Sequence, residues 1–475
     1  MTATPRLVLA GLSGGSGKTI LSLGLARYWR NQGLRVRPFK KGPDYIDAAW
    51  LGRAAGLTAS NLDPFLMSGR VLRGLFAEKL RDADIGLIEG NRGLFDGKDL
   101  EGSCSTSHLS RLLQAPLVLI IDATKMSRTV AAVVQGCNSF EPGLNLAGVV
   151  LNRTGGERHQ SILRRSIEEY TDIPVLGAIP KLGREPIPMR HMGLVSDREF
   201  EAESALETLS RTVGEHTDTA RLHDIAAGVP ELEAETEELW PDEPVQGTGV
   251  RIGVVRDASL WFYYPENLQA LQRAGAEVLE VSLLDREPWP DLHGLYLGGG
   301  FPETQARALA DNMATKALVS RLVESGMPVY AECGGLMYLC SRLAFDGREY
   351  DMAGVFPVCT ELSRRPQGHG YTLSRVVRPN PFHPLGLQFT GHEFHYSRCR
   401  LPRDSRTDCC LSVVRGTGLG HGCDGLVHKN VVAAYVHMHS LSVPSWARNF
   451  VRAGALYREA MRTGQRECDA ISAPN

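Results

Sequence analysis

The sequence has few of the features that mark disulfide-stabilised or secreted proteins. Only 10 of its 475 residues are cysteine, and no two of them have the C-x-x-C spacing. Because this is too sparse for a disulfide framework, we expect free thiols and a cytoplasmic protein. The short apolar run near the N-terminus leads into a glycine loop without a small-residue cleavage site, so we expect a first β-strand there and no secretory signal.

Long hydrophobic runs and an excess of one charge are also missing. The longest apolar runs, such as APLVLIIDA at residues 115–123, are well short of the roughly 18 residues that a membrane helix needs. The 52 Lys and Arg residues stand against 54 Asp and Glu residues, a formal net charge of −2. Nucleic-acid binding requires a strongly basic surface to neutralise phosphate. We therefore expect no membrane segment and no nucleic-acid partner.

The sequence does contain two series of alternating strands and helices. From residue 7 to about residue 180, buried-type strands such as LVLAGL, DIGLIEG and PLVLIIDA alternate with helical patterns, which predicts a parallel sheet with crossover helices. A second series begins at Arg251 with RIGVVRD and includes GLYLGGG and PVYAECGG. We predict an α/β protein of two doubly wound domains, residues 1–200 and 250–475. An acidic linker at residues 201–249, whose first half also fits a helix, separates them.

A phosphate-binding loop follows the first strand. The segment GLSGGSGKT at residues 11–19 opens a helix, where backbone N–H groups and the helix dipole favour phosphate. It departs from the standard G-x-x-x-x-G-K-[ST] pattern, because Leu12 stands where the first glycine belongs. We predict that Lys18 contacts the β- and γ-phosphates and that the Thr19 hydroxyl ligates Mg²⁺. The other predicted nucleotide-binding residues of this loop are Gly14, Gly15, Ser16 and Gly17.

Acidic residues follow the next predicted strands. Asp44 and Asp47 lie in KKGPDYID, and Glu89 lies in LIEGNRGLFDG. Single acidic residues are usually solvated, but these three lie just past strand ends beside glycine, where a doubly wound sheet binds its ligands. One or two carboxylates together with nucleotide phosphates commonly hold Mg²⁺. The position therefore favours a magnesium–nucleotide site.

The C-terminal half contains the parts of a thiol nucleophile site. Cys333 lies in VYAECGG between a strand and a helical pattern, which predicts an exposed sulfur beside a helix N-terminus, where the dipole favours thiolate. The upstream loop LGGGFPE can direct N–H groups at an oxyanion, and the downstream segment YVHMH places His437 and His439 on one face of a strand. Each residue alone is more often structural, but the ordered combination indicates thiol acyl transfer.

These motifs carry a resemblance to a known family over nearly the whole chain. The segments SGGSGKT, PFKKGPDYID, NLD, EGNRGLFDG and RHMGLV resemble the ATP-dependent amidoligase half of cobyrinate a,c-diamide synthases and, more distantly, dethiobiotin synthetase. The segments RDASLWFYYPENL, GGGFPE, AECGG, GHEFHYS and YVHMH resemble the class I glutamine amidotransferase domain of the same group. The resemblance implies that ATP phosphorylates a substrate carboxylate and that ammonia from glutamine then displaces the phosphate.

The resemblance also implies roles for individual residues. In the N-terminal half, Lys18 and Lys40 would face phosphates and Asn152 would contact adenine; Thr19, Asp44 and Glu89 would surround Mg²⁺. In the C-terminal half, Cys333 would attack the glutamine side chain with His437 as general base and acid. The N–H groups of Gly300 and Gly334 would stabilise the oxyanion. Many relatives outside this group carry Glu two residues after the histidine, and because His439 stands there, the existence of a third triad residue is left open.

The expected function is amidation of the a- and c-side-chain carboxylates of cobyrinate or hydrogenobyrinate in cobalamin biosynthesis. The expected partners are the tetrapyrrole carboxylate, glutamine and MgATP, with a homodimer as a further possibility. The main alternative is a sirohydrochlorin or sirohaem amide synthase, which Asn91 and Arg92 mildly favour, and cobyric acid synthase ranks lower. A partitioning-type ATPase shares an altered phosphate loop but has no use for Cys333 and His437. The segment GHEFHYS at residues 391–397 fits either a polar core strand or a ligand-facing wall, and the resemblance favours the wall.

Overall fold

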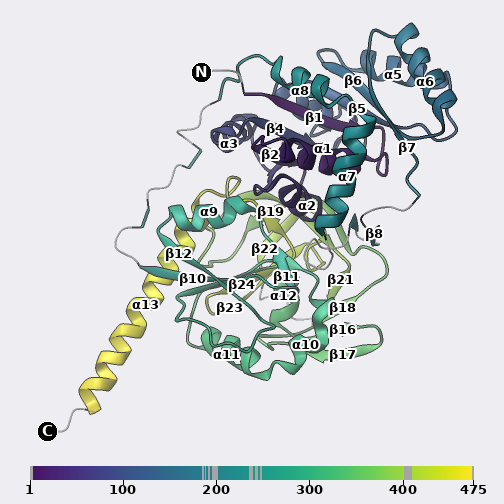
Figure 1. Cartoon of the computed structure of the whole chain (residues 1–475). Helices are drawn as coiled ribbons and strands as arrows, with labels where there is room; N and C mark the ends of the chain where they lie inside the picture. The colour runs from purple at the N-terminus through teal and green to yellow at the C-terminus, as the bar shows by residue number, and fades with distance from the viewer. Residues whose placement is uncertain are drawn as a thin grey trace. The chain divides into compact units, whose positions relative to one another are not determined.

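The computed structural model describes residues 4–183, 187, 189–190, 193–194, 202–234, 239–240, 244–245, 249–400 and 409–472. The chain divides into two compact units, Met1–Leu239 and Trp240–Asn475 (Figure 1). Each unit is built around a β-sheet with helices, so the predicted class, an α/β protein with two such domains, is confirmed. Of the motif RHMGLV at residues 190–195, three residues lie outside the described part of the chain.

The first unit contains a seven-stranded sheet whose described pairings are all parallel, in the order β3-β2-β4-β1-β5-β6-β7. The strand order runs in opposite directions on the two sides of β1, which creates a crevice at the carboxyl ends of the strands, the usual ligand position in such sheets. The strands are β1 (Arg6–Gly11), β2 (Val36–Lys41), β3 (Ser60–Leu62), β4 (Ile85–Glu89), β5 (Leu117–Asp122), β6 (Leu146–Thr154) and β7 (Val175–Pro180). A short hairpin pairs β8 (Met189–Arg190) with β9 (Gly193–Leu194).

Helices follow the strands of this sheet in alternation. Side-chain caps begin several of them: Asp44 accepts the N–H of Asp47 at the start of α2, and Ser68 does the same for the N–H of Val71 at α3. β1 and β4 are buried along their whole length, which explains their continuous apolar sequences. The helices are α1 (Lys18–Asn31), α2 (Tyr45–Ala55), α3 (Gly69–Leu80), α4 (Thr106–Leu112), α5 (Thr129–Phe140), α6 (Glu157–Tyr170), α7 (Ala202–His216) and α8 (Thr219–Ala227).

Helices α7 and α8 belong to the first unit, although their residues fall in the stretch expected to separate the domains. α7 packs directly on α1, as Figure 1 also shows. A Cβ atom on Gly24 of α1 would lie 2.4 Å from Val213 Cγ2 and 2.7 Å from the Leu209 carbonyl oxygen. Arg27, also on α1, pairs with Glu207 at 2.7 Å. Two acidic residues of this stretch, Glu203 and Glu207, therefore pair with Arg27 at the contact between α1 and α7.

The second unit contains a ten-stranded sheet that is parallel on one side and antiparallel on the other. Its parallel half runs β12 (Ala276–Val281), β10 (Val250–Val255), β13 (Gly294–Leu297), β15 (Val329–Glu332) and β24 (Val431–Ala434). Its antiparallel half continues with β23 (Cys423–His428), β22 (Cys409–Arg415), β19 (Gly368–Val376), β20 (Gln388–His395) and β25 (His437–Met438). The sequence alternation predicted β10, β13 and β15 of the parallel half and missed the antiparallel half.

Smaller elements complete the second unit. A four-stranded sheet comprises β17 (Arg348–Asp351), β16 (Cys340–Phe345), β18 (Phe356–Leu362) and β21 (Ser397–Arg400), and a two-stranded sheet comprises β11 (Leu260–Phe262) and β14 (Gly299–Gly300). The helices are α9 (Pro265–Arg273), η1 (Pro302–Gln305), α10 (Ala306–Asp311), α11 (Met313–Glu324), α12 (Gly334–Leu339) and α13 (Ser445–Ser472).

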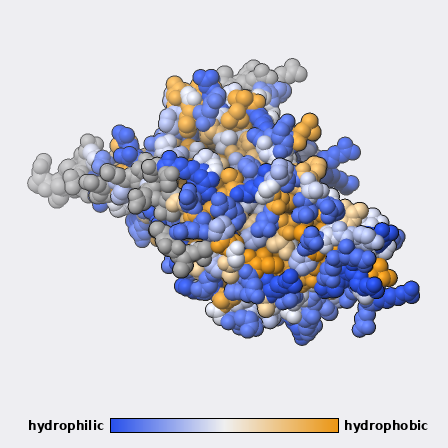
Figure 2. All heavy atoms as spheres, turned by 90° about the horizontal axis from the view of Figure 1, so that it is seen from above, coloured by the Kyte–Doolittle hydropathy of each residue, from blue (hydrophilic) through white to orange (hydrophobic). Residues whose placement is uncertain are grey.

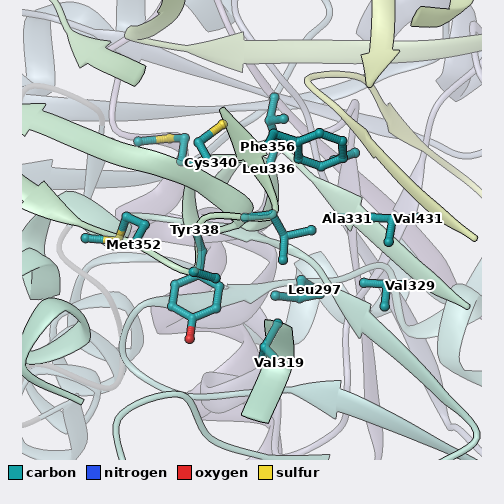
Figure 3. Close-up of a cluster of buried hydrophobic side chains, with 14 of the residues drawn as sticks. Leu297, Val319, Val329, Ala331, Leu336, Tyr338, Cys340, Met352, Phe356 and Val431 are labelled. Atoms are coloured by element: carbon teal, nitrogen blue, oxygen red, sulfur yellow. The ribbon is translucent and has the colours of Figure 1, made fainter. Parts of the chain in front are cut away.

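The helix that follows the predicted nucleophile lies inside the core. All six residues of α12 are buried, and Figure 3 shows Leu336 and Tyr338 among side chains from β13, β15, β24 and α11. Leu336 is fully excluded from solvent, as are Leu297 and Val329 of the adjacent strands. A helix without a polar side is buried on every side. The packing around α12 therefore fixes the turn that precedes it.

The distribution of hydrophobic residues bears on whether a helix could enter a membrane. Figure 2 shows hydrophilic residues spread over one face of the molecule with hydrophobic residues among them. Among the described residues, no helix combines the length and the apolar character needed to cross a bilayer. The predicted absence of a membrane-spanning helix therefore holds for the described part of the chain.

The α1–α7 contact gives a test of packing. We expect Gly24→Ala to lower the free energy of unfolding by about 1–3 kcal/mol, because its methyl group would overlap Val213 and the α7 backbone. Gly136→Ala on α5 is the matched control. A Cβ there meets nothing within 4 Å, so a stability gain of about 0.5–1 kcal/mol is expected from helix propensity. Urea unfolding of both variants measures the difference, and equal stability changes would contradict this packing.

Candidate active sites

The phosphate loop is closed by its own hydrogen bonds. The Ser16 hydroxyl donates to the Ser13 carbonyl at 2.8 Å and accepts the N–H of Ser13 at 3.1 Å. Lys18 Nζ donates to the carbonyls of Ser13 and Arg92, both at 2.9 Å. Burial lowers the pKa of Lys18, and the neighbouring charge of Lys40 lowers it further. Lys18, the residue predicted to contact phosphate, therefore lies within the loop, and a phosphate would compete with these two carbonyls for its ammonium group.

The side chain of Asn152 stabilises the phosphate loop through a hydrogen bond. It lies at the carboxyl end of β6, its side chain is 2% exposed, and Nδ2 donates to the Ser16 carbonyl at 3.0 Å. Gly17 has φ of 99°, and a Cβ atom there would lie 1.9 Å from Asn152 Nδ2, so only glycine fits. The Asn152 amide therefore stabilises the phosphate loop through this hydrogen bond. The predicted contact of Asn152 with adenine stays a prediction, and this geometry does not support it.

Lys40, near the carboxyl end of β2, contacts one carboxylate on α2 and another at the carboxyl end of β4. Its Nζ lies 2.6 Å from Asp47 Oδ2 and 2.7 Å from Glu89 Oε1, and its side chain is buried. Burial on its own lowers the pKa of Lys40, but the charges of Asp47 and Glu89 outweigh it and raise the pKa above its usual range. Thr19 Oγ1 donates to Glu89 Oε1 at 3.0 Å. Lys40, Thr19 and Glu89 are therefore brought together as predicted from sequence.

The oxygen donors at this place suit Mg²⁺. Glu89 Oε2 is buried and has no hydrogen-bond partner, so this carboxylate has an unused acceptor oxygen. Asp44 is used differently, because its Oδ1 accepts the N–H of Asp47 as the cap of α2, and burial raises its pKa to about 7. Within the described residues, no group of three or more His, Cys, Asp or Glu side chains forms a preassembled metal site. A hydroxyl, one or two carboxylates and phosphate oxygens are the donor set that Mg²⁺ commonly uses.

Cys333 lies in a strained turn between β15 and α12. Its φ of 46° and ψ of −97° are unusual for a residue with a side chain, and its N–H donates to the Ala434 carbonyl at 2.7 Å. The two following glycines permit this turn. A Cβ on Gly334 would lie 2.9 Å from Gly300 N, and one on Gly335 would lie 2.6 Å from Leu297 atoms. The predicted strand-turn-helix position of the nucleophile is found, with Gly300 and Gly334 side by side.

The two histidines of YVHMH contact different carboxylates. His437 Nδ1 lies 3.2 Å from Oε2 of Glu332, the residue before Cys333. A Cβ on Gly299 would lie 2.5 Å from His437 Cε1 and 3.2 Å from Nε2, so the opposite ring edge faces the glycine loop. His439 Nε2 instead lies 3.5 Å from Glu266 Oε2. Sequence reasoning missed Glu332, and the only available signal was an acidic residue inside an otherwise apolar strand.

The backbone that leads to His437 is fixed by a buried acid on β23. Asp424 accepts the N–H groups of Tyr435 and Val436, both at 3.0 Å, and that of Gly425 at 2.9 Å. Three N–H groups directed at one carboxylate hold the chain firmly immediately before His437. Asp424 is therefore a second residue of this site that sequence reasoning did not identify.

The electrostatics of Cys333 differ from the sequence expectation. The helix dipole was expected to favour thiolate, but burial, and next the charge of Glu303, raise the pKa of the Cys333 thiol well above its usual range. The side chain is 5% exposed and α12 has only six residues, so desolvation dominates. The Cys333 side chain is consequently a thiol and not a thiolate.

The segment GHEFHYS lies on β20 and the start of β21. His392, Glu393 and His395 are each 5% exposed or less. The ring of His392 stacks on His437 with centroids 4.9 Å apart, and Glu393 accepts the N–H groups of Thr417 and Gly418 at 2.6 and 2.8 Å. These polar side chains contact other parts of the protein, so GHEFHYS matches the first alternative, a polar core strand. The ring of His392 links this strand to His437.

Comparison with known proteins assigns each half of the chain to a family. Residues 7–187 match the "CobQ/CobB/MinD/ParA nucleotide binding domain", and residues 251–444 match the "CobB/CobQ-like glutamine amidotransferase domain". A nucleotide-binding domain joined to a glutamine amidotransferase domain defines a glutamine-dependent ligase.

Relatives that match over nearly the whole chain identify the family within the glutamine-dependent ligases. The cobyrinate a,c-diamide synthase of Magnetococcus marinus is 40% identical over 454 residues, covering 93% of this chain and 96% of that protein. Proteins of the same name from Archaeoglobus fulgidus and Salmonella typhimurium are 38% and 36% identical, each covering 94% of this chain and 97% of the relative. The chain belongs to the cobyrinate a,c-diamide synthase family, which confirms the resemblance found in the sequence.

The raised pKa of Cys333 predicts a distinctive reactivity. Without glutamine, we expect its alkylation by iodoacetamide to keep accelerating as the pH is raised beyond about 8.5, the ordinary pKa of a thiol, because only thiolate reacts. Mass spectrometry of the peptide that contains residue 333 gives the rate, with glutathione in the same buffers as the control thiol. A rate that levels off below pH 8 would show that the resting sulfur is a stabilised thiolate.

Proposed function

We propose that this protein uses ATP and glutamine to amidate the a- and c-side-chain carboxylates of cobyrinate or hydrogenobyrinate, a step of cobalamin biosynthesis. The observation that carries the proposal is the presence of two sites in one chain of this family. One is a strained cysteine with a histidine and a glycine loop, and the other is a phosphate loop beside buried carboxylates. The first releases ammonia and the second activates the acid that receives it.

In the C-terminal unit, the proposed reaction is glutamine hydrolysis through a thioester. His437 Nε2 takes the thiol proton as Cys333 Sγ attacks the side-chain amide carbon, and the N–H groups of Gly300 and Gly334 stabilise the oxyanion. His437 then gives its proton to the leaving ammonia. The close approach of Gly334 to Gly300, where a Cβ would lie 2.9 Å from the Gly300 nitrogen, supports one shared oxyanion position.

In the N-terminal unit, the proposed reaction is formation of an acyl phosphate, which ammonia then converts to the amide. Lys18 and Lys40 face the phosphates, together with the N–H groups of Gly14, Gly15, Ser16 and Gly17. Thr19, Asp44 and Glu89 are proposed to hold Mg²⁺, and Asp47, which already contacts Lys40, joins this set. When bound, Mg²⁺ supplies positive charge against the transferring phosphoryl group.

The substrate is proposed to lie near the loop that contains Asn91 and Arg92. The Arg92 carbonyl accepts from Lys18 Nζ and the Arg92 side chain is exposed, so it is placed to pair with a carboxylate beside the phosphates. Sirohydrochlorin carries similar acids, so an amide synthase for that tetrapyrrole or for sirohaem is the alternative, and cobyric acid synthase is a lesser one. A homodimer stays a prediction.

Measuring amidation with glutamine and with ammonium salt distinguishes the proposed role of Cys333 from that of Lys18. We expect Cys333→Ala to abolish amidation with glutamine but to leave amidation with ammonium salt, because free ammonia bypasses the thioester. We expect Lys18→Ala to lower amidation with either source by about 10²-fold or more, because the phosphoryl charge loses its clamp. Mass spectrometry of the products, in which each amidation replaces OH by NH₂, measures both variants.

Glutaminase activity is the control for folding in this experiment. Lys18→Ala should keep part of it, since the thiol site does not contain Lys18. Normal glutamine-dependent turnover in Cys333→Ala would refute the thioester assignment, and full ammonia-dependent synthesis by Lys18→Ala would refute the role of the loop.

Substrate choice is tested by competition. With cobyrinate and sirohydrochlorin at equal concentrations, we expect the higher kcat/KM for cobyrinate and two added amides per molecule. The ratio of products, measured by mass, gives the preference directly. A preference for sirohydrochlorin, or a product with one amide only, would favour the alternative substrate and leave the ligase chemistry in place.

A further inference from the structure

A chain of buried polar groups ends on His437. Asn267 Nδ2 donates to the Tyr296 hydroxyl at 3.1 Å, the Tyr296 hydroxyl donates to Glu332 Oε2 at 3.2 Å, and this same oxygen lies 3.2 Å from His437 Nδ1. Glu332 Oε1 accepts the N–H of Met438 at 3.3 Å. All four side chains of the chain are 2% exposed or less. A carboxylate so enclosed needs several donors, and it has three.

The order of donors and acceptors defines the protonation of the imidazole. Burial raises the pKa of Tyr296 well above its usual value, so its hydroxyl stays protonated and, because it accepts from Asn267, directs its hydrogen at Glu332. The carboxylate can only accept, so the hydrogen between it and His437 lies on Nδ1. The proton-accepting nitrogen is therefore Nε2, on the ring edge that faces the glycine loop.

His439, at the position where a glutamate was expected in other relatives, has different contacts. Its Nδ1 accepts the N–H of Leu441 at 3.2 Å, and its Nε2 faces Glu266 Oε2 at 3.5 Å. Both ring nitrogens are thus directed at groups other than His437. The carboxylate beside His437 comes from β15, because Glu332 pairs with Ala434 across the β15–β24 ladder, three residues before His437.

We propose that Glu332 positions His437 as the general base and so completes a Cys333–His437–Glu332 triad in which the acid immediately precedes the nucleophile. The inference rests on the proposed thioester chemistry. As Sγ bonds to the amide carbon, the thiol proton moves to Nε2, and it then leaves with ammonia when the C–N bond breaks. Glu332 keeps its negative charge throughout, holds Nδ1–H and stabilises the imidazolium.

The test compares Glu332→Gln with the matched variant Glu266→Gln, which changes the acid beside the other histidine. We expect Glu332→Gln to lower the kcat of glutamine hydrolysis by about 10²-fold or more, because the amide can donate to Nδ1 and leave the proton on Nε2. KM for glutamine should change little, and ammonia-dependent amidation should be retained. Glu266→Gln should keep glutaminase activity within a few fold.

A further readout, the NMR signal of the imidazole, separates positioning from a loss of structure. The groups facing His437 are Glu332 on β15 and His392 on β20, whose ring stacks on it. The strongly deshielded proton of Nδ1–H in the NMR spectrum should be present in the parent and in Glu266→Gln, and absent in Glu332→Gln and His437→Ala.

The possible results of these experiments distinguish the proposed triad from the proposed thioester chemistry. Loss of glutaminase activity in Glu266→Gln with normal activity in Glu332→Gln would overturn the inference and assign the role to the His439 pair. Equal, small losses in both variants would also overturn it. Activity in Cys333→Ala would instead refute the proposed function itself, so failure of the triad and failure of the thioester chemistry are distinguishable.

Discussion

The turn at Cys333 depends on how closely two backbone segments, residues 333–335 and residues 297–300, approach each other. Gly334 lies against Gly300, and Gly335 lies against Leu297 at the end of β13, so a side chain at either glycine would push the segments apart. The buried packing of α12 holds the turn from the other side. These contacts together maintain Cys333 in a backbone conformation that costs about 1–3 kcal/mol. The packing of the surrounding core therefore offsets the free-energy cost of the strained backbone at Cys333.

In the N-terminal unit, ion pairs hold the predicted nucleotide-binding residues in place. Lys40 is surrounded by Asp47 and Glu89, and this buried cluster would be unstable if any one charge were left alone. The cluster lies where β2 and β4 end beside each other, because the parallel register pairs Lys40 with Glu89 directly. Strand register therefore places the Lys40 ammonium within hydrogen-bonding distance of the Glu89 carboxylate.

Much of this organisation could be predicted from sequence because it is local. The phosphate loop, the strand before it and the cysteine turn are each defined by a few adjacent residues, and each is found where expected. The antiparallel half of the second sheet was missed because strand pairing is a long-range property. Glu332 was missed for the same reason: its partner is set by the β15–β24 ladder, not by spacing along the chain. The dipole argument for Cys333 failed because desolvation, which depends on the finished core, is the larger effect.

The contact between Gly17 and Asn152 has a consequence for how this sequence can vary. The amide occupies the space that any β-carbon at residue 17 would need, and it also holds the Ser16 carbonyl. A larger residue at 17 needs a smaller one at 152, which removes the support of the loop, and the φ of 99° strains any side chain at 17 in either case. The free-energy effects of the two substitutions are therefore not additive. Residues 17 and 152 are therefore energetically coupled, although they lie far apart in the sequence.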